Sequence, residues 1–564
     1  MSVIAGNGGG AGGTQPGHQS SGRPIRSTLE HARHRGHRRT ARGFAVGTAL
    51  TLIAFAPSAA ASARDSAADG DRISWTTQYV APGVEVRTGV LDIPEAAGVW
   101  TVTVQAPAVN RLTGAPTWAL LGDRSWADAT AEKLRAAGFE PRLERVTWDA
   151  YADTPRGTMG WQVRVGRYGT QGEARSLNSA VSGAGFRTSV EWTGYDGRQP
   201  ADAQRIHVAV VDPRRLRGTV EASDGGNTAD REKTSTVARR LGSLVGVNGG
   251  FFVTSDADGV QGTTAGLSVV DGELQSMAVG SRAALVLQDG GRRARVADLS
   301  SSVTVRAGSA VHAVEGVNRV PGKVRNCGRP GAVPTELPRQ DLTCSLADDL
   351  VEFTTEFGAP LPSGAGSQVV LDEDGVVVSR GDRGGTVPAV GAVLQGTGEA
   401  ATWLAEHADV GRRLHLRERV RDASGRRIAL GPDDSVVSAA PTLVENGRVH
   451  IDAATEGTLD PLDLSFGFAW SNVRQPRTMA GVDRHGRLLL ATVDGRQPGV
   501  SEGFTLAEAA RFMRTLGAVQ ALNLDGGGST AMAVNGVLVN TPSDATGERA
   551  VGDTVQILRD PDQG

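Results

Sequence analysis

The sequence predicts an α+β protein with a large mixed or antiparallel sheet and a small domain of two βαβ units. Short apolar runs, many alternating with polar residues, recur along the chain, and glycine-rich turns separate them. Two similar segments each contain a strand, an amphipathic helix and a second strand. The 564 residues exceed what one ordinary core accommodates, so two or more domains are expected.

The composition and the N-terminus indicate an exported globular protein. A net charge of -3 argues against a general nucleic-acid binder. Residues 1–63 are predicted to be a signal peptide, with basic "HARHRGHRRTAR", apolar "GFAVGTALTLIAFA" and small-residue "PSAAASA" in succession. The apolar part is shorter than the ~20 residues of a membrane span. We therefore expect a secreted or cell wall-associated protein without a stable span after cleavage; an uncleaved anchor is the alternative.

Two regions follow the signal peptide. Residues 64–115 are predicted to hold a spacer and the first strands of the large domain that resumes after the small one, including "GVEVRTGVLDI" and "VWTVTVQAPAV". Residues 116–196 contain the two βαβ units, the first beginning with the strand "TWALL". The second unit resembles the SPOR family through "WQVRVGRYGTQGEARSL" and "AGF". That resemblance implies that the domain binds peptidoglycan glycan strands lacking stem peptides; the alternative is a structural insert without a ligand.

Cys327 and Cys344 are the two cysteines of the chain, and they flank a loop rich in proline and glycine. In an oxidising compartment such a pair forms a disulfide, so we expect a staple across "CGRPGAVPTELPRQDLTC". No further cysteine and no suitably spaced histidine pair indicates a metal site. No cofactor is predicted, and the pattern leaves a divalent cation open.

The C-terminal quarter carries the most chemical information. Strands flank the turn at His485-Gly486, and the second strand ends at Asp494. Thr505 caps a helix, with Glu508 completing a capping box. The next apolar strand, "VQALNLDGG", ends at Asp525. If the two strands are neighbours, both carboxylates reach one edge of the sheet, and paired carboxylates are what glycoside hydrolysis requires.

Three glycines follow Asp525 directly. Without side chains, Gly526, Gly527 and Gly528 allow a ligand to approach the backbone, and their N–H groups could form a nest for an anion. Ser529 and Thr530 could add hydroxyl donors. The alternative is a tight strand connection in which Asp525 bonds its own turn.

This region resembles the phosphodiester glycosidase family. The matching blocks include "GVNGGFF", "RQPRTMAGVD", "VDGRQPGVSEGFTLAEAA", "LGAVQALNLDGGGSTAM", "NTPSD" and "GERAVGDTVQIL". The resemblance implies a catalytic domain over residues 204–564, with the small domain inserted into it. It also implies hydrolysis of sugar-1-phosphodiesters at the anomeric carbon. The catalytic candidates are Asp525, Asp494 and Glu548. The substrate-binding candidates are Asn248, Arg477, Thr478, Arg496, Asn523, Gly526, Gly527, Gly528, Ser529, Thr530 and Arg549.

Each candidate role has an alternative. Arg477, Arg496 and Arg549 could grip phosphate, or form surface or structural salt bridges. Asn248 bonds a substrate hydroxyl or fixes its loop, and Glu548 is a third active-site carboxylate or the partner of Arg549. For the whole protein, the rivals to a wall-associated glycosidase are a non-catalytic cell-wall glycan-binding or polysaccharide-assembly factor, and a phosphodiesterase that cleaves the P–O bond.

Overall fold

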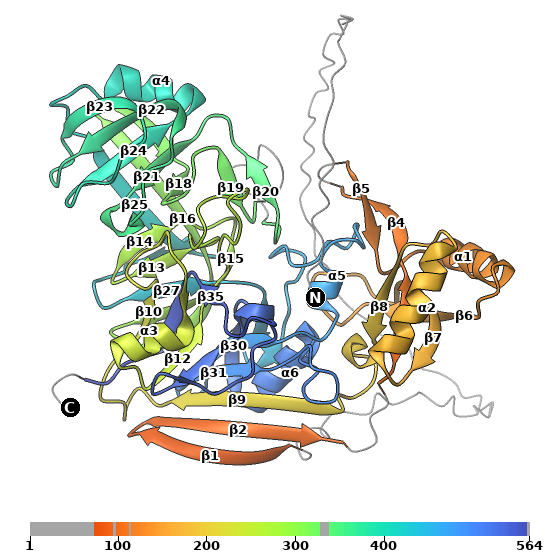
Figure 1. The fold of residues 1–564 in the computed structure, drawn as a ribbon. Helices are drawn as coiled ribbons and strands as arrows, with labels where there is room; N and C mark the ends of the chain where they lie inside the picture. Colours follow the sequence, from red (N-terminus) through yellow and green to blue (C-terminus); the bar gives the residue numbers. More distant parts are fainter. Residues whose placement is uncertain (1–72, 94–97, 112–113, 328–337, 561–564) are drawn as a thin grey trace, which may run out of the picture. The chain divides into compact units, whose positions relative to one another are not determined.

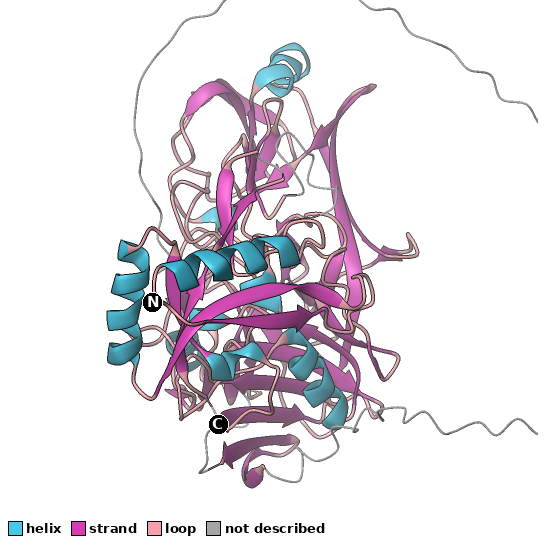
Figure 2. Ribbon diagram, turned by 90° about the vertical axis from the view of Figure 1, so that its right-hand side faces the viewer, coloured by secondary structure: helices cyan, strands magenta, loops and turns pink. Residues whose placement is uncertain are grey.

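Strands account for most of the regular structure, and helices are few (Figure 1). The structure is a computed structural model that describes residues 73–93, 98–111, 114–327 and 338–560. The predicted signal peptide, residues 1–63, lies outside these ranges. Figure 2 shows the same strand-dominated α+β fold from the side. Within the ranges described, no helix is long and apolar enough to cross a membrane.

The central sheet has eight strands, and each neighbouring pair is antiparallel. Its order is β1 (Ser74–Ala81), β2 (Val84–Asp92), β9 (Ala203–Val211), β31 (Leu488–Val493), β30 (Arg477–Asp483), β32 (Ala518–Asn523), β28 (Thr442–Glu445) and β29 (Arg448–Val449). β2 pairs with β9 although the small domain separates them in the sequence. The chain therefore leaves this sheet after β2 and returns to it in β9.

Both faces are buried in the middle of the central sheet, as β31 illustrates, whereas the edge strand β1 is largely exposed. Leu488 and Leu490 enter one core, while Leu489 and Ala491 enter the core beneath helix α6 (Leu506–Thr515). Side chains alternate between the two faces of a strand, so a strand covered on both sides reads as a continuous apolar run. The capping box that begins α6 at Thr505 confirms the sequence prediction.

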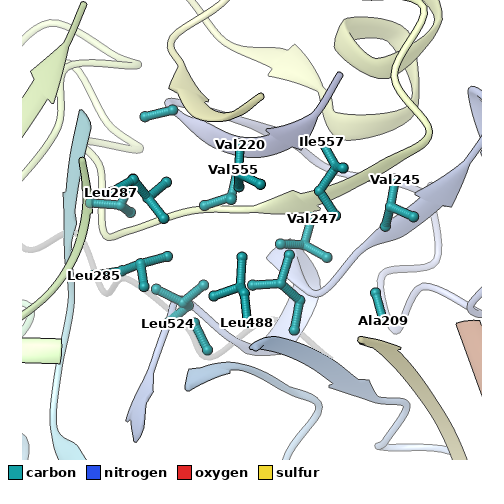
Figure 3. Packing of buried hydrophobic residues seen from close by; sticks show 14 of the residues in the cluster. Ala209, Val220, Val245, Val247, Leu285, Leu287, Leu488, Leu524, Val555 and Ile557 are labelled. Carbon is teal, nitrogen blue, oxygen red and sulfur yellow. The ribbon is translucent and has the colours of Figure 1, made fainter. Parts of the chain in front are cut away.

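A five-stranded antiparallel sheet covers one face of the central sheet. Its order is β10 (Val220–Ser223), β36 (Thr554–Ile557), β12 (Val245–Asn248), β33 (Met532–Val534) and β34 (Val537–Leu538). Helix α3 (Thr234–Leu241) precedes β12. Figure 3 shows Val247 and Val555 of this sheet in one cluster with Leu488 and Leu524. This core lies beneath the strand ends at which the sequence analysis placed the candidate catalytic residues.

Two further sheets lie together around a third apolar core. The first contains β14 (Glu273–Ser276), β13 (Ser268–Val270), β27 (Ser435–Ser438), β15 (Arg282–Gln288), β16 (Arg293–Ala307), β25 (His415–Asp422) and β26 (Arg427–Ile428), with β17 (Ala310–Val314) paired to β16. The second contains β18 (Gly316–Val317), β21 (Leu350–Phe353), β24 (Ala392–Gly396), β22 (Gly364–Leu371) and β23 (Val377–Arg383). Only β18 and β21 pair in parallel among the described neighbours of these two sheets.

The small domain has four strands, with helices α1 (Arg124–Ala136) and α2 (Gln171–Gly183) packed against them. Its order is β6 (Pro141–Thr147), β7 (Thr158–Tyr168), β3 (Trp100–Val104) and β8 (Thr188–Trp192). The sequence analysis began this unit with "TWALL", but the strand there, β5 (Pro116–Ala119), pairs only with β4 (Ala106–Val109) among the described strands. Trp100–Val104 supplies the first strand instead. Both runs look like strands, and only pairing with β7 and β8 distinguishes them.

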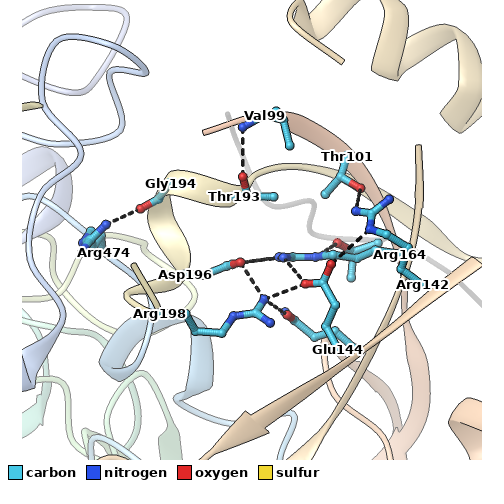
Figure 4. A network of polar contacts seen from close by, with 12 residues as sticks. Val99, Thr101, Arg142, Glu144, Arg164, Thr193, Gly194, Asp196, Arg198 and Arg474 are labelled. Carbon is cyan, nitrogen blue, oxygen red and sulfur yellow. Dashed lines mark hydrogen bonds and ion pairs between the residues drawn. The ribbon is translucent and has the colours of Figure 1, made fainter. Parts of the chain in front are cut away.

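The sheet face of the small domain away from the helices carries a buried polar network (Figure 4). Arg164 is 1% exposed and pairs with Asp196 at 2.5 Å and with Glu144 at 3.0 Å. Arg198 contacts the same two carboxylates. Such a cation is tolerated away from water only when acceptors surround it. The network therefore satisfies the buried Arg164 guanidinium on this face of the sheet.

Arg474 connects this small domain to the strands that carry the C-terminal motifs. Its guanidinium donates to the carbonyl of Gly194 at 2.6 Å (Figure 4) and to that of Gln199 at 2.5 Å. It also pairs with Glu502 at 3.0 Å and with Glu508 at 2.6 Å. Glu508 thus serves both the capping box and this contact. The loop sequence predicts a solvated Glu502, but this is wrong, because the side chain is 2% exposed and pairs with Arg474.

Candidate active site

A cavity of about 260 Å³ opens at the edge of the central sheet where the "LDGGG" motif lies. Its walls contain Asp525, Gly526, Gly527 and Gly528. Three arginines that the sequence analysis selected also line it, together with Thr254 and six further residues that it did not select, namely two phenylalanines, a tryptophan, two glutamines and an aspartate. These additional lining residues are Arg477, Arg496, Arg549, Phe251, Phe252, Trp470, Gln340, Asp341 and Gln475.

The strand register brings the motif residues to one edge. β31 and β32 both pair antiparallel with β30, one on each side of it, so they run in the same direction and end together. Asp494 follows β31, and Asp525 lies just beyond β32. Arg477 begins β30 at that edge, opposite Val493. The sequence expectation that both aspartates reach one sheet edge therefore agrees with the strand order.

Asp525 is one of two carboxylates in the described cavity lining, the other being Asp341. Its Oδ1 accepts a hydrogen bond from the Gly526 N–H at 2.9 Å. Its own N–H donates to the Gly249 carbonyl at 3.0 Å, and its carbonyl accepts from Asn248 Nδ2 at 2.8 Å. Burial raises the pKa of the Asp525 carboxyl to about 6, and the nearby Arg549 opposes this increase. A carboxyl in this range can serve as a base or nucleophile near neutral pH.

The glycines permit the arginines to lie against bare backbone. A Cβ on Gly528 would lie 2.2 Å from Arg549 Nη2 and 2.3 Å from a carboxylate oxygen of Asp544. Gly527 has a left-handed φ of +61°, which favours glycine, and Arg496 packs against it. The expected N–H nest is largely used up within the protein, because Gly526 and Gly527 both donate internally. Anion binding at this loop therefore falls mainly to the guanidinium groups.

The three arginines differ in how they are held. Arg477 donates to the carbonyls of Phe504, at 3.0 Å, and Trp470, and its guanidinium lies 4.9 Å from the Trp470 ring centroid. Burial lowers the pKa of Arg477 to about 10, so it is still a cation at neutral pH. Its hydrogen bonds go to carbonyl oxygens, which leaves its positive charge at the cavity wall.

Arg496 and Arg549 form a neighbouring pair of cations. Arg496 donates to Gln475 Oε1 at 2.6 Å, and burial lowers its pKa, with the charge of Arg549 adding to the effect. Arg549 pairs with Asp544 at 2.8 Å and is 35% exposed. Counting Arg477, three guanidinium groups line the cavity with two carboxylates, Asp341 and Asp525, so an excess of positive charge remains beside Arg496 and Arg549. A phosphate bound between them would relieve it.

Asp494 does not line the cavity, although it reaches the same sheet edge. It is 2% exposed, and its carboxylate accepts from Asn540 Nδ2 at 3.1 Å and from the Thr541 N–H at 2.9 Å. Burial raises its pKa to about 6. Its contacts hold the "NTPSD" segment, which carries Asp544. The structure therefore gives Asp494 a positioning contact, and its role in the reaction stays a prediction.

Glu548 also lies outside the cavity lining. It accepts from the Ser235 N–H at 2.8 Å and from the Ser235 hydroxyl at 2.5 Å, at the beginning of α3. The sequence analysis offered Glu548 as the ion-pair partner of Arg549, but that partner is Asp544. Asp544 lies five residues before Arg549, and the turn between them contains Gly547, whose φ is +86° and whose N–H donates to the Asp544 carbonyl at 2.9 Å.

The remaining predicted residues form a buried layer that shapes the loop. Asn248 is fully buried, and its Oδ1 accepts from Thr478 Oγ1 at 2.6 Å and from the Ala531 N–H at 3.1 Å. Asn523 donates to the Ala440 carbonyl at 2.9 Å. Ser529 and Thr530 are 1% and 2% exposed. Asn248 thus has the loop-fixing contacts that were the alternative to substrate binding.

One carboxylate close to the motif was not selected from the sequence. Asp553 is 2% exposed and accepts from the Gly250 N–H at 2.7 Å. Burial raises its pKa to about 7, and the charge of Asp525 contributes to the increase. Asp553 lies in the quoted block "GERAVGDTVQIL", before the buried strand β36. An aspartate directly before a buried strand within that family-like block could have identified Asp553 as a candidate site residue.

The chain is similar to one family model, to a solved structure and to curated proteins. Residues 365–558 match the family model described as phosphodiester glycosidase. A crystal structure of a protein from Burkholderia pseudomallei K96243 whose export is predicted is 33% identical and has a TM-score of 0.74. That comparison covers 86% of this chain and 96% of the other.

Two curated mammalian relatives match a shorter stretch. The N-acetylglucosamine-1-phosphodiester alpha-N-acetylglucosaminidase of Mus musculus is 35% identical over 116 residues, which is 20% of this chain and 22% of the relative. The Homo sapiens protein of the same name is 35% identical over 114 residues, again 20% of this chain and 22% of the relative. The chain thus spans about a fifth of the length of these curated relatives.

Proposed function

The chain belongs to the phosphodiester glycosidase family, and on that premise we propose that it hydrolyses the glycosidic bond of sugar-1-phosphodiesters. One observation carries the proposal. Asp525, a carboxylate with a pKa near 6, lines the same cavity as the cations Arg496 and Arg549. That cavity therefore combines a base or nucleophile with a site for a phosphate group.

The geometry supports a simple reaction course. Arg496 and Arg549 hold the phosphate, which departs with the bridging oxygen as the bond from that oxygen to the anomeric carbon breaks. A phosphate ester is a good leaving group, so it requires little protonation. Asp525 then either activates a water that attacks the anomeric carbon or attacks it directly before water releases the sugar. In both courses the glycosyl group ends on water and a phosphomonoester leaves.

The first test is release of free sugar from a panel of sugar-1-phosphodiesters, beginning with N-acetylglucosamine esters. The full mature chain is compared with Asp525→Asn and with Asp494→Asn, which changes the other predicted catalytic aspartate, outside the cavity lining. We expect Asp525→Asn to lose at least about 100-fold in rate, because general acid–base or nucleophilic groups contribute that much or more. A parent chain that releases no sugar from any diester would refute the proposal and favour the non-catalytic glycan-binding role.

Hydrolysis in oxygen-18 water separates the proposal from its second rival. Cleavage of the carbon–oxygen bond places the label in the released sugar, as proposed here. A phosphodiesterase that cleaves the P–O bond would place the label in the phosphate product. Label in the phosphate would therefore replace the glycosidase with that rival, while leaving the phosphate-binding role of Arg496 and Arg549 in place.

We further propose that the protein acts outside the cell on phosphodiester-linked glycans of the cell wall or an exopolysaccharide. Support comes from the Cys327–Cys344 disulfide, a bond typical of oxidising compartments, and from the predicted export of the Burkholderia relative. Phosphodiester-linked wall polymers such as teichoic acids suit the proposed bond specificity.

Attachment to peptidoglycan through the small domain is also a proposal. The network around Arg164 occupies the sheet face without helices, so a glycan strand would have to use the remaining surface of the domain. Co-sedimentation of the mature chain with peptidoglycan freed of stem peptides tests this attachment. A chain that stays in the supernatant would refute the attachment without affecting the proposed hydrolysis.

A further inference from the structure

We propose that Gln340 and Asp341, which lie shortly before the disulfide-bonded Cys344, form a sugar-recognition element that hydrogen-bonds the hydroxyl groups of the substrate's glycosyl unit. The inference rests on the proposed function and deepens it. The phosphodiester glycosidase family model matches residues 365–558, so the match does not include these two residues. Both residues nevertheless line the same cavity as Asp525.

The stretch that holds these two residues is anchored at its base. β19 (Lys323–Arg325) pairs antiparallel with β20 (Thr343–Ser345), and the disulfide lies beside this ladder (Figure 1 shows both strands). Cys327 and Cys344 are 0% and 1% exposed and belong to an apolar cluster with Val279 and Val324. This base fixes the direction in which the chain approaches β20, and Gln340 and Asp341 come just before that strand.

Hydrogen bonds from their backbone N–H groups also hold the two residues in place. The Gln340 N–H donates to the Gly457 carbonyl at 2.8 Å, and the Asp341 N–H donates to Asn326 Oδ1 at 3.0 Å. Asp341 has a φ of +60°, a conformation that L residues seldom adopt but aspartate tolerates. The backbone at Gly457 packs so closely against this part of the chain that a Cβ on Gly457 would lie 2.0 Å from the Pro338 carbonyl oxygen.

Both side chains retain capacity for hydrogen bonds. Gln340 is 7% exposed, and within the described part of the chain its Oε1 has no hydrogen-bond partner. A buried amide oxygen left without a partner destabilises the free protein, and a donor from a ligand would satisfy it. Asp341 Oδ1 pairs with Arg325 at 2.8 Å, yet the carboxylate side chain is 68% exposed. An amide beside a carboxylate is well suited to bind neighbouring sugar hydroxyls.

Aromatic rings complete this side of the cavity. Phe251 and Trp470 both line it, with ring centroids 6.0 Å apart in an edge-to-face arrangement. Arg282 lies 5.7 Å from the Phe251 centroid, and Arg477 lies 4.9 Å from the Trp470 centroid, so buried cations hold both rings. Rings fixed in this way offer an apolar surface for the carbon face of a sugar.

The charge distribution orients the substrate. The carboxylate of Asp341 repels a phosphate, whereas Arg496 and Arg549 attract one. Charges at both ends of the cavity affect the pKa of Asp525, because Arg549 lowers it and the charge of Asp341 raises it. The phosphate therefore belongs with the arginines, the sugar with Gln340 and Asp341, and the bond that joins them belongs beside Asp525.

The test measures binding by the full mature chain with isothermal titration calorimetry. The probes are a panel of hexose-1-phosphates and N-acetylhexosamine-1-phosphates, with inorganic phosphate in parallel. The variants are Gln340→Ala and Asp341→Asn, and the matched control is Asp258→Asn. Asp258 also pairs with Arg325, at 3.4 Å, but does not line the cavity. Thermal unfolding of each variant confirms that it is folded.

We expect both cavity variants to weaken the tightest sugar-1-phosphate by about 10-fold or more, the loss typical of one hydrogen bond in a buried site. Neither should weaken inorganic phosphate, and Asp258→Asn should leave both probes within about 2-fold of the parent. Equal losses for the sugar phosphate and for inorganic phosphate would overturn the inference. So would variants that bind every sugar phosphate as tightly as the parent.

The outcomes also separate this inference from the proposed function. A parent that binds sugar phosphates through Gln340 and Asp341 but hydrolyses no diester would refute the function and support the recognition element. A parent that hydrolyses diesters, with variants of unchanged KM and kcat, would refute the recognition element and support the function. A parent that binds no member of the panel overturns the recognition element.

Discussion

Substituting alanine for Gly528 places a methyl group against the Arg549–Asp544 ion pair. The added Cβ would lie 2.2 Å from Arg549 Nη2 and 2.3 and 2.4 Å from the two carboxylate oxygens of Asp544. Real Cβ atoms do not approach other atoms this closely, so the ion pair must move. Both partners are ends of flexible, partly exposed side chains, at 35% and 26%, so moving them costs the fold little.

The expected effect is therefore on phosphate binding. Displacing Arg549 removes one charge-assisted hydrogen bond to the phosphate, worth about 1.5–3 kcal/mol. That corresponds to a loss of roughly 10- to 150-fold in kcat/KM. The unfolding free energy should fall by no more than about 1 kcal/mol. Gly526→Ala is the informative contrast, because its Cβ would lie 2.8 Å from the Pro476 carbonyl, a backbone atom. That variant should lose about 1–3 kcal/mol of stability.

The assay combines three measurements on Gly528→Ala, Arg549→Ala and the double variant: kcat/KM for the best diester, affinity for inorganic phosphate, and unfolding by denaturant. Because both single changes act through one contact, the double variant should lose no more kcat/KM than Arg549→Ala alone. A folded Gly528→Ala chain with kcat/KM within about 2-fold of the parent would refute the reasoning. Fully additive losses would show that Arg549 and Gly528 act independently.

Three further expectations follow from the same contacts. Hydrolysis should rise with pH through about 6 as Asp525 ionises, and a pH–rate profile that is flat between about pH 5 and about pH 7 would contradict a role for its carboxylate as base or nucleophile. The pKa values of Asp494, Asp525 and Asp553 are raised in the folded state to about 6, 6 and 7. Their contribution to stability is therefore present below about pH 4 and is lost as pH rises to about 7. Denaturant unfolding should show this loss of stability, and the loss should be smaller in Asp553→Asn. Replacing Cys327 and Cys344 together by serine should lower the unfolding free energy by about 3 kcal/mol, the chain-entropy value for a separation of 17 residues. The same change should weaken sugar-1-phosphate binding more than inorganic phosphate binding. Equal stability of the oxidised parent and the variant would contradict the predicted loss of unfolding free energy.

Several local features could be predicted because short-range chemistry determines them. The capping box at Thr505 and Glu508 depends on residues three apart, and the hairpin turns at Asp271-Gly272 and Asn535-Gly536 depend on left-handed backbone that these residues tolerate. The disulfide followed from there being one possible pair. Asp525 could be selected because a carboxylate followed by bare backbone is a local pattern.

Contacts between distant segments decided the rest. Asp494 and Asp525 occupy equivalent places at strand ends, yet the segment at Asn540 and Thr541 folds over Asp494 and leaves Asp525 facing the cavity. The orientation of a side chain beyond a strand end depends on which loop packs over it, and strand periodicity carries no information about that loop. For the same reason, two runs with equal strand character could not be ranked before their pairing was known, and Trp100–Val104 displaced "TWALL" as first strand of the small domain.

The sequence by itself determined the class of fold, the family, the glycine-flanked carboxylate and the stapled loop, because each of these is carried by residues close together along the chain. Only the tertiary structure decided which groups share the cavity with Asp525. Gln340 and Asp341 reach it from a segment far from Asp525 in the sequence, and Asp544 rather than Glu548 pairs with Arg549. Such proximities arise from strand order and loop packing, which bring side chains together irrespective of their separation along the chain.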